Sequence, residues 1–185
     1  MQTGQKSIHA YLILKSQEGD RRAQNELFKL YADAMYNICR RMMGNEDDAK
    51  DVLQDSFIHV FSKMNALRNI DTFSAWIKRI VINHCINALK KKSIISGDIE
   101  NVGDFPEVGE DDNMDRLKFE TKKILEAIDK ISEGCKTVLN LYLFEGYDHK
   151  EIAEILAISE SASKAQYSKA KAKVRGLLEE EKFRS

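Results

Sequence analysis

The stretch Glu145–Glu160, EGYDHKEIAEILAISE, contains within sixteen residues the signals for a short helix and for the start of a second one. Asp148 and Glu151 have the three-residue spacing of a capping box, so we expect a helix to begin here. Its inward residues would be Ile152, Ala153, Ile155 and Leu156. Only residues 157–159 then separate it from a longer helix with an apolar stripe. A short helix, a three-residue turn and a longer helix predict a helix-turn-helix, which lays its second helix in the DNA major groove.

The second helix of this motif is basic. Five lysines or arginines and no acid lie between Ser161 and Arg175. Such a helix can be a solvated lysine face, but the adjoining turn and short helix favour DNA contact. Lysine neutralises phosphates and glutamine can bond adenine through two hydrogen bonds. The predicted DNA-contacting residues are Ser161, Ser163, Lys164, Gln166, Ser168, Lys169 and Lys171.

Upstream of the motif the charge reverses. Residues 98–115 carry eight acids, no base and the only proline of the chain, Pro106. This composition cannot bury enough apolar surface to order itself. We therefore predict an acidic flexible linker over residues 96–118, between a helical domain at 1–95 and a helix-turn-helix domain at 119–185.

The first domain is also expected to be helical. Apolar spacing predicts a helix over Ala23–Met43 that ends near Gly44, and Asn45 is placed to cap the next one. That next helix is apolar on one side and acidic on the other, and the acidic ridge consists of Asp48, Asp51, Gln54 and Asp55. An ordinary exposed face would look similar. However, Lys50 is the only base from Glu46 to Asp55, so a basic protein partner is also plausible.

A third helix is predicted after Asp71-Thr72, ending at a run of three lysines. The segment before and inside it mixes aromatic, amide and basic side chains, as single-strand nucleic-acid readers do. Trp76 is open to two interpretations, a buried scaffold residue or a stacking platform for a base. The better candidates for contact are Lys78, Arg79, Asn83 and Asn87.

Composition excludes several classes. Nine glycines and one proline in 185 residues are too few for the turns of an all-β fold, so we predict an all-α protein. No apolar run is long enough to cross a bilayer and no signal peptide is recognisable, which predicts a cytoplasmic protein without membrane insertion. Cys39, Cys85 and Cys135 fit neither a disulfide framework nor a metal knuckle and are expected in the core. We expect no catalytic residue, metal or cofactor.

Two separate motifs resemble the extracytoplasmic-function (ECF) sigma factors of bacterial RNA polymerase. Gly44–Phe57 is similar to the core-binding helix of that family, and Phe73–Leu89 to its promoter-melting segment. Glu145–Leu156 followed by Ile158–Glu160 is similar to its C-terminal helix-turn-helix. The resemblance implies a sigma region 2 at 1–95 and a sigma region 4 at 119–185.

This resemblance also implies roles for the predicted residues. The acidic ridge would dock on the clamp helices of the polymerase β′ subunit, and the protein would also contact the β flap. Asn69 and Asp71 would hold a base flipped from the melted −10 element, whose strands Lys78, Arg79, Asn83 and Asn87 would touch. The second helix of the helix-turn-helix would read the −35 element. An anti-sigma factor would hold the protein inactive.

The sequence departs from the family at the turn. Ala157 stands where family members usually have glycine, so a left-handed backbone there would cost about 1 kcal/mol. Two other classes of protein fit this sequence less well. A simple helix-turn-helix regulator has no use for the acidic ridge beside an amide-rich basic helix, and a scaffold without DNA leaves both basic segments unexplained.

Overall fold

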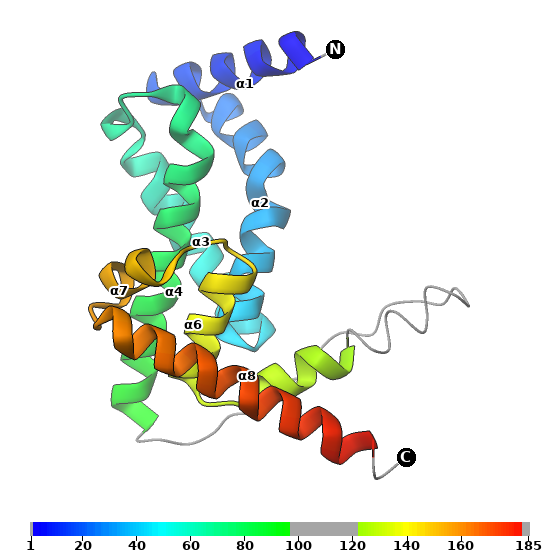
Figure 1. The fold of residues 1–185 in the computed structure, drawn as a ribbon. Helices are drawn as coiled ribbons and strands as arrows, with labels where there is room; N and C mark the ends of the chain where they lie inside the picture. Colours follow the sequence, from blue (N-terminus) through cyan, green and yellow to red (C-terminus); the bar gives the residue numbers. More distant parts are fainter. Residues whose placement is uncertain (1, 97–121, 183–185) are drawn as a thin grey trace. The chain divides into compact units, whose positions relative to one another are not determined.

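The structure is a computed structural model that describes residues 2–96 and 122–182, which are helical and contain no strand (Figure 1). The prediction of an all-α chain is therefore confirmed over these ranges. The chain divides into two compact units, residues 1–97 and 98–185. The acidic linker predicted over 96–118 lies outside the described residues, apart from Ser96.

The first unit is a bundle of four helices. In chain order these are α1 (Gln2–Gln17), α2 (Arg21–Met43), α3 (Glu46–Ser62) and α4 (Phe73–Ser96). Two short 3-10 turns, η1 (Met64–Ala66) and η2 (Ile70–Thr72), connect α3 to α4. The helix α2 packs against the other three, and α3 packs against α4. The fully buried side chains of this core include Leu27, Met42, Val60, Phe73, Ile77 and Val81.

Two predicted helix boundaries of this unit, the end of α2 and the start of α3, are confirmed by their caps, whereas α4 continues past the run of three lysines to Ser96. Gly44 ends α2 with φ 78°, a left-handed conformation that glycine adopts without a Cβ clash. The side chain of Asn45 accepts a hydrogen bond from the backbone N–H of Asp48 at the start of α3. Cys39, Cys85 and Cys135 are buried and form no disulfide.

Sequence patterning did not predict α1. Its apolar residues do not form one stripe, because Ile8, Tyr11 and Leu14 are largely exposed while Ile13 is fully buried. Tertiary contacts hold the helix instead. The side-chain amide of Gln17 donates to the carbonyl oxygens of Met64 and Leu67, at 3.2 and 2.9 Å. These bonds tie α1 to the connection between α3 and α4.

The second unit packs a helix over residues 122–129, α6 (Glu133–Leu143), α7 (His149–Leu156) and α8 (Glu160–Lys182). Its central cluster consists of Ile128, Ile131, Cys135, Leu139 and Ala170. Ser132 occupies the N-cap position of α6, but its side chain makes no capping hydrogen bond.

The helix-turn-helix has the predicted boundaries. Asp148 and Glu151 form both hydrogen bonds of a capping box at the start of α7. Ala157 ends α7 in the left-handed region, with φ 56° and ψ 46°, and it is the only described non-glycine residue with a positive φ. The turn therefore stores backbone strain at the position where a glycine would relieve it.

Ala157→Gly is expected to stabilise the second unit. Relief of the left-handed strain gains about 1 to 2 kcal/mol, and the greater flexibility of unfolded glycine cancels about half of that gain. The melting temperature should rise by about 2 to 6 °C in scanning calorimetry. Ala165→Gly, at an exposed position inside α8, is the control and should lower it. A lower melting temperature for Ala157→Gly would show that the turn is unstrained.

Candidate interaction surfaces

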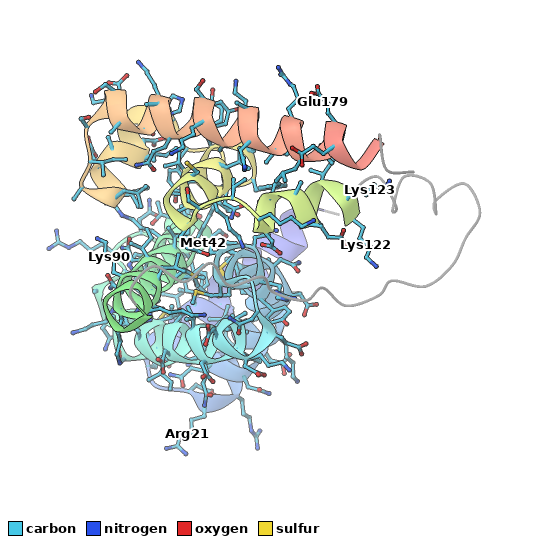
Figure 2. All side chains as sticks on the ribbon, turned by 90° about the horizontal axis from the view of Figure 1, so that it is seen from below. Arg21, Met42, Lys90, Lys122, Lys123 and Glu179 are labelled. Atoms are coloured by element: carbon cyan, nitrogen blue, oxygen red, sulfur yellow. The ribbon has the colours of Figure 1, made fainter. Side chains whose placement is uncertain are left out.

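The acidic ridge lies on α3, and three of its four side chains face solvent. Asp51, Gln54 and Asp55 are exposed. The neighbouring Lys50 pairs with Glu46 at 2.5 Å, one turn back along the helix. On α4, the exposed Lys90 extends away from the ribbon (Figure 2). The ridge is thus an accessible carboxylate surface supported by a packed core.

Asp48 differs from the rest of the ridge. One of its carboxylate oxygens accepts hydrogen bonds from the Asn45 amide at 2.6 Å and from the Lys92 ammonium of α4 at 3.0 Å. The Asn45 hydrogen bond, followed by Lys92, lowers the pKa of the Asp48 carboxyl, although partial burial opposes the shift. Asp48 therefore joins α3 to the end of α4. Sequence reasoning missed this pair because its members lie 44 residues apart.

Beyond Asp55, two histidines meet between α3 and α4. The rings of His59 and His84 lie edge to face, with centroids 5.2 Å apart. Burial lowers the pKa of His84, the charge that His59 can carry lowers it further, and Asp55 raises it. The fold therefore favours the neutral imidazole of His84.

This pKa shift predicts a pH dependence. A lowered pKa in the folded state means that the unfolded chain binds the proton more tightly, so the stabilising contribution is complete above about pH 6.5 and is lost as the pH falls through the folded pKa. The His84→Gln variant should not lose this part of its folding stability as the pH falls. Urea unfolding of wild type and variant at about pH 7.5 and about pH 5.5 measures it. Parallel pH profiles for the two proteins would contradict the shift.

The loop before α4 is ordered by its own side chains. The side-chain oxygen of Asn69 accepts from the backbone N–H of Asp71 at 3.0 Å. The Thr72 hydroxyl donates to the backbone carbonyl of Asn69 at 2.7 Å. Asn69 and Asp71 are both exposed. The two predicted base-holding residues therefore sit on one short, hydrogen-bonded turn.

Three of the predicted contact residues on α4 form one exposed row. Arg79, Asn83 and Asn87 follow one another at four-residue intervals and are exposed. At 100° per residue they lie within about 80° of one another around the helix. Lys78 is half-buried and lies to the side of this row. Trp76 is half-buried too, with its ring centroid 6.0 Å from that of the buried Phe73, so it belongs in part to the scaffold.

On α8, most of the predicted DNA-contacting residues are accessible. The exposed ones are Ser161, Lys164, Ser168, Lys169 and Lys171. Lys164 pairs with Glu160 one turn earlier at 2.6 Å. The Lys171 ammonium lies 4.5 Å from the centroid of the Tyr167 ring, a cation–π contact.

Ser163, one of the predicted DNA-contacting residues, does not lie on the exposed side of α8. Its side chain is fully buried, and its hydroxyl lies 2.9 Å from Nδ1 of His149. Ser163 is four residues before Tyr167 and therefore shares the inward stripe of α8. Gln166 is half-buried, and its side-chain oxygen would lie 3.4 Å from a Cβ at Gly134 of α6. Ser163 therefore connects α7 to α8.

The same region contains a cluster that the sequence did not reveal. His149 stacks on Tyr142, with ring centroids 4.7 Å apart at an interplanar angle of 20°. Tyr167 closes the cluster, at 4.5 Å from Tyr142. Because α6, α7 and α8 each contribute one ring, the cluster fixes the helix-turn-helix at its centre. His149 is more than the polar helix-start residue that its position beside Asp148 suggests.

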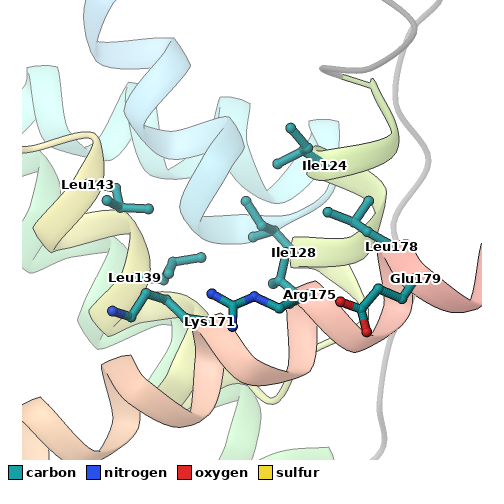
Figure 3. A pocket seen from close by; sticks show the side chains of 9 residues that line it. Ile124, Ile128, Leu139, Leu143, Lys171, Arg175, Leu178 and Glu179 are labelled. Carbon is teal, nitrogen blue, oxygen red and sulfur yellow. The ribbon is translucent and has the colours of Figure 1, made fainter.

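An apolar groove of about 400 Å³ opens between the helix over 122–129, α6 and α8 (Figure 3). Its lining is apolar, from Ile124, Ile128, Leu139, Leu143, Val174 and Leu178. Lys171, Arg175 and Glu179 also line it, so its charged part is mainly basic. Ile124 and Leu143 remain about half exposed.

Among the described residues, no group of three or more histidine, cysteine, aspartate or glutamate side chains could hold a metal ion. None of the described helices is both long and apolar enough to span a bilayer.

Comparison with protein families gives two matches, one in each unit. Residues 27–94 match Sigma-70 region 2, and residues 121–174 match Sigma-70 region 4. The ECF RNA polymerase sigma-E factor of Haemophilus influenzae is 28% identical over 155 residues, covering 78% of this chain and 82% of that protein. RNA polymerase sigma factor SigV of Bacillus subtilis is 28% identical over 120 residues, covering 65% and 69%.

Two solved structures share the fold. The sigma factor RpoE from Bartonella quintana, in complex with the anti-sigma factor NepR, has a TM-score of 0.59 at 19% identity, over 84% of this chain and 96% of that one. CnrH, in complex with the cytosolic domain of CnrY, has a TM-score of 0.55 at 22% identity, over 93% and 97%. With both sigma regions matched and ECF relatives across most of its length, the chain belongs to the ECF sigma factors, which direct RNA polymerase to specific promoters.

Proposed function

We propose that the first unit binds core RNA polymerase through the acidic ridge of α3. Asp51, Gln54 and Asp55 are the exposed contacts, and their charge suits a basic partner, which we infer to be the clamp helices of the β′ subunit. Asp48 belongs to the same site but acts mainly on α4, through Lys92. Exposed carboxylates on a rigid helix carry this proposal.

The first unit also opens the promoter at the −10 element. Asn69 and Asp71 lie on one ordered turn and would hold a base flipped from the strand. Arg79, Asn83 and Asn87 would follow the strand along α4, with Lys78 at the edge of the row. Unstacking a base costs a few kcal/mol, and a pocket with neighbouring cations offsets that cost. The polymerase performs the chemistry, and the chain supplies no catalytic group or cofactor.

The second unit reads the −35 element with the exposed side of α8. Ser161, Lys164, Ser168, Lys169 and Lys171 are the contact residues, while the half-buried Gln166 lies at the edge of this surface. Phosphate contacts by lysine set the affinity and the orientation, and the polar side chains read base edges.

The apolar groove of the second unit would provide a further contact with core polymerase. Its apolar lining and basic charges suit an amphipathic helix, and we assign it to the flap of the β subunit. An anti-sigma factor would compete for these surfaces, as the complexes of the structural relatives suggest. Because its partners are polymerase and promoter DNA, the protein would act in the cytoplasm.

Run-off transcription tests the proposed function. Purified core polymerase is mixed with the chain and with promoter fragments selected in vitro by the assembled holoenzyme. We expect transcripts of defined length only when both proteins are present. A chain that binds duplex DNA tightly by itself and yields no transcript with core would instead be a simple helix-turn-helix regulator.

A further inference from the structure

A chain of hydrogen bonds joins three helices at the start of α4. The hydroxyl oxygen of Tyr31 on α2 lies 2.6 Å from Nε2 of His9 on α1 and 2.7 Å from the hydroxyl oxygen of Ser74 on α4. A tyrosine hydroxyl can donate one hydrogen bond and accept another, so Tyr31 can satisfy both neighbours at once. Nothing in the proposed function uses this contact.

The same three helices are joined by aromatic packing. Phe73, the first residue of α4, is almost fully buried. Its ring centroid lies 5.1 Å from that of Tyr31 and 5.9 Å from that of His9, in edge-to-face arrangements that aromatic rings favour. Both Phe73 and Ser74 are therefore held by α1 and α2, at the end of the bundle that α1 crosses (Figure 1).

This anchored helix start is continuous with the proposed base-holding turn. Phe73 directly follows Thr72, whose hydroxyl bonds back to Asn69. The turn η2, which contains Asp71, packs against both α1 and α4. A loop already held in its binding conformation loses less conformational freedom when a ligand arrives, so it binds more tightly.

We propose that Tyr31 is a positioning residue for base capture: through Ser74 and Phe73 it holds the start of α4 so that Asn69 and Asp71 are aligned for a base flipped from the −10 strand. This inference rests on the proposed function, and Tyr31 itself touches no DNA in it. The proposal also gives α1 a role, because Nε2 of its His9 lies within hydrogen-bonding distance of the Tyr31 hydroxyl.

The test uses Tyr31→Phe, which removes the hydroxyl and keeps the ring against Phe73. Tyr11→Phe, the same change at an exposed position of α1, is the matched control. Ser74→Ala breaks the same bond from its exposed end. Holoenzymes containing each protein are titrated with single-stranded oligonucleotides that carry a −10 element selected in vitro by the wild-type holoenzyme. A second series carries one abasic site at each −10 position in turn.

We expect one or two positions at which an abasic site weakens binding of the wild-type holoenzyme. Tyr31→Phe and Ser74→Ala should bind the intact oligonucleotide about fivefold more weakly, the effect of losing a hydrogen bond that orders the site. At these one or two sensitive positions, however, an oligonucleotide with an abasic site should bind the variant and wild-type holoenzymes with equal affinity. Tyr11→Phe should match wild type throughout.

Two results would overturn the inference alone. One is an unchanged affinity of the Tyr31→Phe holoenzyme for the intact oligonucleotide. The other is an equal loss on intact and abasic oligonucleotides, which would make Tyr31 a residue of general structural importance only. A wild-type holoenzyme without any position sensitive to an abasic site would overturn the proposed base capture itself, and the inference with it.

Discussion

Replacing Asp51 and Asp55 together by lysine is expected to abolish holoenzyme assembly. Both side chains are exposed on α3, so the substitutions remove no core contact and should leave the fold intact. They place two cations where the proposed partner surface is basic, and each like-charge contact costs several kcal/mol. Affinity for core polymerase should therefore fall by at least about 100-fold. Fluorescence anisotropy with labelled chain and unlabelled core measures it.

A matched control separates docking from net charge. Glu26→Lys with Asp33→Lys makes the same change in total charge at exposed positions of α2. This control should bind core polymerase with the affinity of the wild type, and only its association rate should change slightly. Normal assembly by the α3 double variant, or equal loss by both double variants, would remove the acidic ridge from the docking surface.

Lys164→Ala with Lys169→Ala is expected to weaken binding to the −35 element by about ten- to hundredfold at low salt, because two charged contacts to phosphate are lost. In a plot of the logarithm of affinity against the logarithm of salt concentration, the slope should be about two units shallower than for the wild type. Lys164 contributes in a second way, since it pairs with Glu160, whose carboxylate would otherwise repel the DNA. Assembly with core polymerase should not change.

The control for this prediction replaces two lysines that form ion pairs, as Lys164 does, but lie in the first unit. Lys15 pairs with Glu18 at 2.6 Å and Lys29 with Glu26 at 2.8 Å, both in the first unit. Their replacement by alanine should leave the affinity for a −35 duplex and its salt slope at the wild-type values. An unchanged slope for the α8 double variant would show that Lys164 and Lys169 do not meet phosphates.

Local features of this protein are predictable from sequence because the interactions that define them are local. Gly44, Asn45 and the capping box of Asp148 and Glu151 act within four residues of their own positions. Ala157 stands where the family resemblance places a glycine, and its backbone is left-handed in the structure. The number of helices in the helix-turn-helix and the exposure of the acidic ridge follow from the periodicity of the apolar residues.

What sequence missed depends on contacts between distant residues. Asp48 pairs with Lys92, and Gln17 holds the backbone at Met64 and Leu67, at separations of 44 to 50 residues. No local pattern encodes these bonds. The packing of α7 on α8 likewise decides that Ser163 is buried, although serine in a basic helix looks like a DNA contact.

The docking of α3 on the polymerase is tested most directly by photocrosslinking. A photoreactive amino acid at Gln54, in the middle of the exposed ridge, reports which subunit lies against it in the assembled holoenzyme. We predict a crosslink to the clamp helices of β′, mapped by mass spectrometry, and none to β′ from the same probe at Asp33 on α2. Crosslinks from Gln54 to another subunit alone would contradict the account.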